Sequence, residues 1–101
     1  MREVIWSAHA RTQYLTAVEY LADRNQPAAE RLVERVEKTA RDLADRPIGR
    51  PGYALDTFEK IVPKTSYVIV YELCGDELRV LRLFHMAQDW RGWRDEHAAA
   101  Q

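Results

Sequence analysis

Residues 67–85, with the sequence YVIVYELCGDELRVLRLFH, decide the class of fold. They contain two runs rich in β-branched and aromatic residues, 67–73 and 77–85, on either side of Gly75 and Asp76. Runs of this composition are typical of β-strands, and so short a connection containing glycine is typical of a tight turn. The sequence therefore predicts a β-hairpin at this place.

Alternation along the second strand predicts which side chains share a face of the sheet. Leu78, Val80, Arg82 and Phe84 are expected on one face, and the residues between them on the other. A guanidinium group among apolar neighbours is unusual, so Arg82 either pairs with an acidic residue or serves a function.

The segment before the hairpin continues the β pattern. Residues 57–62 are expected to form a strand that ends at Pro63, and residues 48–56 are expected to form a loop. The loop prediction rests on the glycine and proline residues of that segment, which favour turns.

The N-terminal part of the chain predicts a short strand followed by two helices. Residues 3–6 have the composition of a strand, and Ser7 follows them where a helix N-cap is expected. Apolar residues at helical spacing then predict a helix of about 16 residues that ends in the polar stretch 23–26. Pro27 suits the first turn of a second helix, and Pro47 ends it. Because few residues separate them, the helices are expected to form an antiparallel hairpin.

The expected order of elements is therefore β-α-α-β-β-β, which belongs to the α+β class. A helix hairpin of this kind packs on one face of a mostly antiparallel sheet. A chain of 101 residues rarely holds two cores, so residues 1–101 are expected to form one domain.

Composition excludes several classes of protein. Lys and Arg together number 15 and Asp and Glu 16, and no segment is strongly basic, so sequence-specific DNA binding by this chain alone is not expected. The longest apolar run, 67–71, is far too short to span a bilayer, and residues 1–20 lack the features of a signal peptide. A cytoplasmic protein without contact to a membrane is expected.

The sequence predicts neither a metal site nor a cofactor. Cys74 is the single cysteine, so a disulfide bond within the chain is excluded. The three histidines, His9, His85 and His97, lack the spacing of metal ligands and have no cysteine partner nearby. We therefore expect no metal and no cofactor.

Several short strings, in their order and spacing, resemble the RelE/ParE superfamily of toxins from bacterial type II toxin–antitoxin systems. The strings are VIWS at 4–7, YL at 20–21, PAA at 27–29, LAD at 43–45, PIGRPG at 47–52, YVIVY at 67–71, LRLFH at 81–85 and DW at 89–90. They look more like the ParE branch, whose members inhibit DNA gyrase. The resemblance implies a toxin that acts by binding gyrase, without chemistry of its own, and that a ParD-like antitoxin neutralises in a hetero-oligomer.

The resemblance also implies a docking surface for the antitoxin. Antitoxins of the superfamily wrap the toxin with a C-terminal segment that is disordered when free and forms a helix and a strand on binding. The expected fold offers a groove along the helix hairpin and a sheet face that the helices leave uncovered. The candidate antitoxin-binding residues are Tyr14, Leu21, Leu32 and Val36.

The alternative is a ribosome-dependent mRNA endonuclease of the RelE branch. Cleavage without a metal needs a proton acceptor, a donor to the leaving oxygen and cations on the phosphate. The residues considered for these roles are Glu59, Lys60, Lys64, Arg82 and His85, of which Lys60, Arg82 and His85 are the catalytic candidates in a nuclease. However, Val68 and Met86 stand where nucleases of the superfamily carry Arg and Tyr, so no catalytic residue is expected.

The target-binding surface is expected in the C-terminal third of the chain. Its candidate residues are Arg82, His85, Asp89, Trp90 and Trp93, because Arg and aromatic side chains are the usual anchors of protein interfaces. Two structural interpretations stand beside this one, with His85 as a hydrogen-bonded residue of the sheet and Trp90 as part of the core. The sequence also leaves open an inactive scaffold that only binds its antitoxin.

Overall fold

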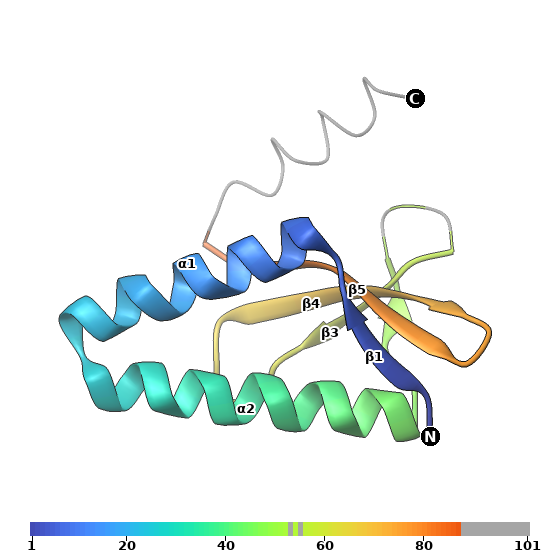
Figure 1. Ribbon diagram of the computed structural model, residues 1–101, viewed down its shortest axis with the longest axis horizontal. Coiled ribbons are helices and arrows are strands. Elements are labelled where there is room, and N and C mark those ends of the chain that lie inside the picture. The colour runs from blue at the N-terminus through green and yellow to red at the C-terminus, as the bar shows by residue number, and fades with distance from the viewer. Residues whose placement is uncertain (53, 55, 88–101) are drawn as a thin grey trace.

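The computed structural model describes residues 1–52, 54 and 56–87. In this part of the chain, one strand is followed by two helices and four further strands (Figure 1). The elements are β1 (Glu3–Trp6), α1 (Ala8–Arg24), α2 (Gln26–Asp45), β2 (Arg50–Pro51), β3 (Phe58–Ile61), β4 (Tyr67–Cys74) and β5 (Glu77–His85). The predicted order is confirmed with one addition, because the two residues of β2 lie in the segment 48–56 that the sequence predicts as a loop.

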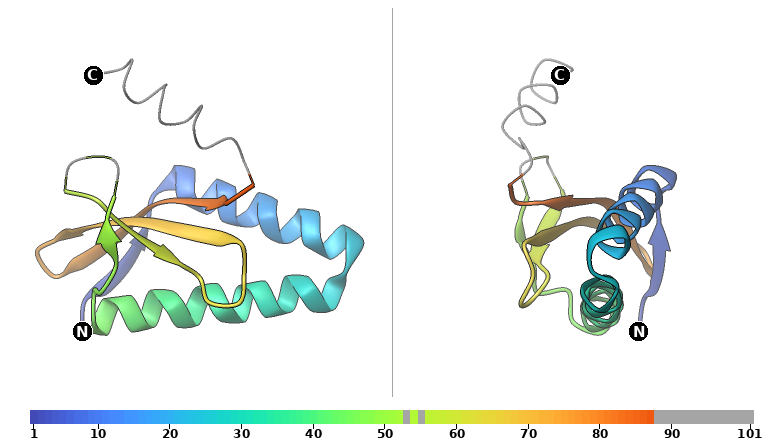
Figure 2. Two further views of the ribbon diagram at one scale, coloured as in Figure 1. Left: turned by 180° about the vertical axis from the view of Figure 1, so that it is seen from behind. Right: turned by 90° about the vertical axis from the view of Figure 1, so that its left-hand side faces the viewer.

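The strands of the described residues form a five-stranded sheet in the order β1-β5-β4-β3-β2. Neighbouring strands are antiparallel except β1 and β5, which are parallel. Both helices lie on the same side of β3, β4 and β5 (Figure 2). The prediction of a helix hairpin on one face of a mostly antiparallel sheet is therefore confirmed.

The side chains of two polar residues fix where the helices begin. The Ser7 hydroxyl accepts a hydrogen bond from the Ala10 amide at 3.0 Å, as expected of an N-cap. The Asn25 amide donates to the Leu21 carbonyl at 2.6 Å. The Asn25 side chain in turn accepts from the Ala28 amide at 3.1 Å. One residue thus ends α1 and starts α2, which brings the two helices into a hairpin.

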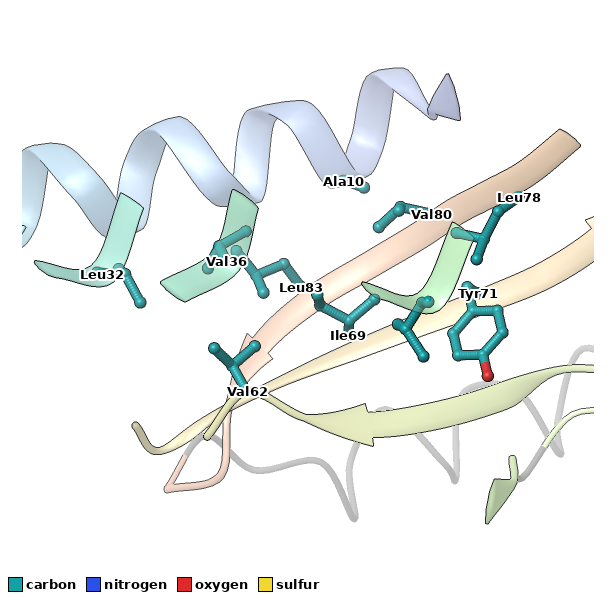
Figure 3. Close-up of a cluster of buried hydrophobic side chains, with 10 residues drawn as sticks. Ala10, Leu32, Val36, Val62, Ile69, Tyr71, Leu78, Val80 and Leu83 are labelled. Carbon is teal, nitrogen blue, oxygen red and sulfur yellow. The ribbon is translucent and has the colours of Figure 1, made fainter. Parts of the chain in front are cut away.

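The core lies between α2 and the sheet. α2 contributes the buried residues Ala29, Leu32, Val36, Thr39, Ala40, Leu43 and Ala44, whereas Ala10 is the one buried residue of α1. Figure 3 shows side chains of α2 and of the sheet filling the space between them. α2 can bury a whole face because its apolar residues form one stripe opposite a charged face. α1 instead exposes Leu15 and Tyr20, each to 55%.

α1 also covers the edge of the sheet where β1 ends. β1 pairs only with residues 77–80 of β5. Beyond this point, the Gln13 side-chain oxygen accepts a hydrogen bond from the Leu83 amide at 2.9 Å. The Ser7 hydroxyl donates to the Leu81 carbonyl at 3.2 Å. These contacts satisfy backbone groups that an open edge would offer to a foreign strand.

β5 contains a β-bulge near its centre. Val70 of β4 pairs with Arg82 of β5. The next residue of β4, Tyr71, pairs with Val80, so Leu81 is skipped in the pairing. An additional residue of this kind shifts the alternation of side chains by one position.

The bulge makes the sequence-based placement of Arg82 wrong. Leu78 and Val80 belong to the core before the bulge, and Leu83 belongs to it after the bulge. Arg82 and Phe84 consequently lie on the opposite face of the sheet, away from the helices, which we call the outer face. Arg82 therefore does not share a face with Leu78 and Val80.

β2 is held in place by the hydroxyl of Tyr71. Tyr71 is fully buried, and its hydroxyl accepts a hydrogen bond from the Gly49 amide at 2.8 Å. Burial raises the pKa of this phenol, and the hydrogen bond from Gly49 opposes that shift to a smaller extent. A side chain at Gly49 would collide with the hydroxyl and would lie 2.9 Å from the Glu59 carbonyl. Glycine is therefore the residue that lets the segment before β2 approach the sheet this closely.

Candidate functional site

The outer face carries a row of four residues that pair across β2, β3, β4 and β5. The row runs from Arg50 through Glu59 and Val70 to Arg82. The Glu59 carboxylate is 6% exposed and lies 3.4 Å from the guanidinium of Arg50, which is 64% exposed. A carboxylate so far removed from water requires a compensating partner, and Arg50 supplies one. The row thus places two arginines on the outer face with a buried carboxylate between them.

Apolar residues adjoin this row on the outer face. Val68 of β4 is buried and pairs with the half-buried Phe84 of β5. On its other side Val68 pairs with Ile61, which is 41% exposed. The outer face therefore combines charged and apolar side chains, a composition that protein interfaces share.

A second surface feature is a groove between α1 and the ends of β4 and β5, which we call the α1 groove. It encloses about 520 Å³. Thr12, Thr16 and Tyr20 line it from α1, and Tyr67, Leu83 and His85 line it from the strands. Its position follows from α1, which lies over the edge of β5 and fills less of the core than α2 does.

Aromatic contacts shape the strand side of the α1 groove. The rings of Tyr67 and His85 meet edge to face, with centroids 5.0 Å apart. His85 also accepts a hydrogen bond at Nδ1 from the Ala87 amide at 2.9 Å. Burial raises the pKa of Tyr67, and the neighbouring Tyr20 raises it further. The Tyr67 hydroxyl consequently stays protonated, and this wall of the groove presents two aromatic rings.

The three nuclease candidates lie on different parts of the described surface. Lys60 pairs with the core residue Ile69 and lines a second groove, of about 330 Å³, beneath α2. Arg82 lies on the outer face, and His85 lies in the α1 groove. The core residues Ile69 and Leu83 stand between Lys60 and His85. The structure therefore does not bring these three side chains together.

The two other residues considered for nuclease chemistry are also placed apart. Glu59 is the buried carboxylate of the outer face. Lys64 lies in the turn between β3 and β4, where its φ is 61° and its carbonyl accepts a hydrogen bond from Arg35 at 3.1 Å. Glu59 thus serves the packing of the sheet and Lys64 the shape of a turn.

Two of the four candidates for antitoxin binding are core residues. Leu32 and Val36 of α2 are 3% and 0% exposed and point into the core (Figure 3). Tyr14 and Leu21 of α1 are half-buried and pack against the edge of the core. The structure thus leaves Tyr14 and Leu21 with surface for a partner and gives Leu32 and Val36 almost none.

Tyr14 also joins the two helices. Its ring stacks on Trp6 with centroids 4.9 Å apart, and its hydroxyl donates a hydrogen bond to the Glu37 carboxylate at 3.1 Å. Burial raises the pKa of Tyr14 well above its usual range, and the negative charge of Glu37 raises it further. The contact therefore links α1, α2 and β1 through a phenol that stays protonated.

The remaining candidates for target binding, Asp89, Trp90 and Trp93, lie outside the described residues. Their roles stay predictions. Of the described candidates, Arg82 and His85 lie on opposite faces of β5. A single partner surface would have to reach around the end of the strand to contact both.

Within residues 1–52, 54 and 56–87, no group of three His, Cys, Asp or Glu side chains could hold a metal ion. In the same part of the chain, no helix is both long enough and apolar enough to cross a membrane.

Reasoning from the sequence missed Arg50 and Tyr20 as surface residues of interest. A signal for Tyr20 exists, because Thr12, Thr16 and Tyr20 recur at a spacing of four and lie on one side of α1. Arg50 has no such signal, since its importance depends on the pairing of β2 with β3.

Two solved structures share this fold. The structure is similar to that of the "Chromosomal ParDE TA system from P. aeruginosa", with a TM-score of 0.73 and 17% identity over 84% of this chain and 96% of that chain. It is also similar to the "YoeB/ParE toxin from Agrobacterium tumefaciens", with a TM-score of 0.58 and 15% identity over 82% of this chain and 96% of that chain.

The sequence itself identifies the family. Residues 4–90 match the family described as "ParE toxin of type II toxin-antitoxin system, parDE". The chain therefore belongs to the ParE toxin family. A search of curated protein sequences found no match.

Proposed function

We propose that this ParE-family toxin inhibits DNA gyrase by binding to it, without chemistry of its own, and that it acts in the cytoplasm. The proposal rests on the family and on one observation, the separation of the candidate nuclease groups. Lys60 lies beneath α2, Arg82 on the outer face and His85 in the α1 groove. A metal-independent nuclease has to place its proton acceptor, proton donor and cation around one phosphate.

Ribosome-dependent mRNA cleavage is the competing function. Val68, at a position where nucleases of the superfamily carry Arg, is 3% exposed and packs within the sheet. Primer extension on mRNA from translating ribosomes, incubated with the purified protein, tests this function directly. We expect no cleavage. Cuts at discrete codon positions that disappear with His85→Ala would replace the binding mechanism with a catalytic one.

A ParD-like antitoxin in a hetero-oligomer is the second part of the proposal. The P. aeruginosa structure of similar fold is described as a ParDE system, which supports a partner of the same kind here. On this chain, α1 offers the surface, with exposed Leu15 and Tyr20 beside half-buried Tyr14 and Leu21. Expression of the toxin alone should arrest growth, and coexpression with the antitoxin should restore it. Unimpaired growth with the toxin alone would contradict the proposal.

Gyrase is proposed to meet the C-terminal third of the chain, at Arg82, His85, Asp89, Trp90 and Trp93. Because Arg82 lies on the outer face of the sheet and His85 lies on the opposite face, the two residues are substituted separately. We expect Arg82→Ala and Trp93→Ala to relieve growth inhibition while antitoxin binding and the melting temperature stay nearly unchanged. A large fall in melting temperature in these variants would assign the residues a structural role instead.

A further inference from the structure

The groove beneath the C-terminal half of α2, which we call the α2 groove, has a largely apolar lining. It encloses about 330 Å³ between α2 and β3. Thr39 and Leu43 of α2 form its floor and are 5% and 1% exposed. Pro63, after β3, and Ile48, before β2, line its sides. A partner in this groove would therefore have apolar surface to pack against.

Ile48 exposes its side chain from a backbone that is held in place. The side chain is 72% exposed although it lines the groove. The Ile48 amide donates a hydrogen bond to the Arg46 carbonyl at 2.9 Å, and the next amide, of Gly49, donates to the Tyr71 hydroxyl at 2.8 Å. An apolar side chain on a fixed backbone gives contact surface to a partner at a small cost in conformational entropy.

Lys60 of β3 brings a positive charge into the α2 groove. It is half-buried, and no described residue accepts a hydrogen bond from its ammonium group. The nearby carboxylate of Asp42 instead pairs with Lys38 at 2.8 Å. Asp45 and Arg46, adjacent residues at the end of α2, carry opposite charges. A half-buried ammonium group without an acceptor favours a negatively charged ligand.

The surroundings of Lys60 favour an acidic peptide over a nucleic acid. Binding of a phosphate backbone requires several cations along its path, whereas the carboxylates of Asp42 and Asp45 also line this groove. The exposed Ile48 offers a contact that a phosphate backbone does not use. A peptide can satisfy both features, because it can carry a carboxylate beside an apolar side chain.

We propose that the α2 groove binds an acidic peptide segment of a partner protein. A carboxylate of the segment accepts a charge-assisted hydrogen bond from Lys60, and a neighbouring apolar side chain packs against Ile48 and Pro63. The groove residues are not among the proposed contacts with gyrase or with the antitoxin on α1. The segment therefore does not compete with either of them for the same side chains.

This inference goes beyond the proposed function and does not depend on it. Peptide binding is measured on the toxin by itself, without gyrase and without antitoxin. It can therefore fail while gyrase inhibition stands, and it can hold if the target proves to be another molecule.

Titration of isotope-labelled toxin with a short peptide, followed by NMR, tests the proposal. The probe is the peptide acetyl-Gly-Leu-Glu-Gly-amide, and we expect it to shift the amide signals of Ile48 and Lys60 but not those of α1. Glutamine in place of the glutamate should weaken binding about tenfold, because the charged hydrogen bond is lost. Glycine in place of the leucine should also weaken it. Equal affinity of the three peptides, or the same shifts with acetate at equal concentration, would overturn the proposal.

Variants of the toxin test the contact with Lys60. Lys60→Gln should weaken binding of the probe about tenfold, whereas Lys64→Gln should change it less than about twofold. Lys64 is the matched control because it is exposed, lies outside the groove lining and carries the same charge. Equal effects of the two substitutions would show that net charge alone attracts the peptide.

A charge reversal keeps the test independent of lost stability. Lys60→Glu should prefer the peptide that carries lysine in place of glutamate, and a well-dispersed NMR spectrum shows that the variant is folded. Failure of this reversal in folded protein would contradict a direct contact with Lys60. Tighter binding of oligothymidine than of the acidic peptide would assign the groove to nucleic acid instead.

Discussion

Replacing Gly49 by Ala is expected to destabilise the protein through Tyr71. The new methyl group would collide with the Tyr71 hydroxyl and would lie 2.9 Å from the Glu59 carbonyl, so the segment before β2 has to move away from the sheet. Such crowding costs about 1–3 kcal/mol. The movement also breaks the 2.8 Å hydrogen bond from the Gly49 amide, which is worth about 1 kcal/mol.

A smaller effect acts in the opposite direction. Alanine restricts the unfolded chain more than glycine does, which stabilises the folded state by about 0.4–1 kcal/mol. The net loss in the free energy of unfolding is therefore about 1–3 kcal/mol. For a domain of this size, that corresponds to a melting temperature lowered by roughly 5–20 °C.

A double-mutant cycle with Tyr71→Phe isolates the contact. Each single substitution loses the same hydrogen bond, and removing the hydroxyl takes away the closest of the contacts that the methyl group would make. The double variant should thus be more stable than the sum of the single effects by about 1 kcal/mol or more, measured by urea unfolding. Gly75→Ala is the control, because nothing lies within 4 Å of its added carbon, and it should be additive with Tyr71→Phe. Additivity in the Gly49 cycle would refute the role given to the hydroxyl.

Three further predictions concern stability, each measured by urea unfolding. Because burial and Glu37 raise the pKa of Tyr14, the unfolded chain loses the phenol proton of Tyr14 above a pH of about 10, while the folded protein retains it. The free energy of unfolding should therefore fall as the pH rises further, and it should fall less steeply in Tyr14→Phe. An equal slope in both proteins would contradict the raised pKa of Tyr14. Leu43→Ala should cost about 2–5 kcal/mol because Leu43 is 1% exposed. Leu15→Ala should stay within about 0.5 kcal/mol because Leu15 lies on the surface, and similar losses at both sites would mean that α1 is buried in solution. Arg50→Ala removes the cation beside buried Glu59 and should lower the free energy of unfolding by about 1–3 kcal/mol. Adding Glu59→Gln to this variant should restore part of the loss. No recovery would show that the Glu59 carboxylate has sufficient other partners.

The sequence predicts those elements of the fold that are determined by residues close together in the chain. The β-branched and aromatic composition on both sides of Gly75 predicts the hairpin, and the side-chain oxygen of Ser7 predicts the start of α1. In both cases residues near in sequence provide the interactions, and the structure confirms them.

The features that escaped prediction depend on residues far apart in the chain. β2 has only two residues, and it becomes a strand through its pairing with β3 and the hydroxyl of Tyr71. The bulge at Leu81 leaves the composition of β5 unchanged but reverses the face of Arg82. A period-two pattern cannot reveal where such a residue is inserted.

The candidate site was harder to predict than the fold. Leu32 and Val36 belong to the apolar stripe of α2, and the same stripe that suggests a docking surface is also what a core requires. The exposed Leu15 and Tyr20 of α1 emerge only once the helix is placed over the edge of β5. The distribution of Lys60, Arg82 and His85 over three surfaces likewise follows from strand register, which the sequence alone does not provide.

DNA supercoiling by gyrase tests the central claim most directly. Purified gyrase, relaxed plasmid and ATP are mixed with increasing amounts of the toxin, and supercoiled product is measured by electrophoresis. We predict inhibition that becomes complete at a toxin concentration comparable to that of gyrase and that equal amounts of antitoxin reverse. Lys60→Ala, which removes a catalytic candidate of the nuclease alternative but no proposed gyrase contact, should leave this inhibition unchanged. Full supercoiling at a large excess of a toxin preparation that still arrests growth would contradict the claim that this protein acts by binding gyrase.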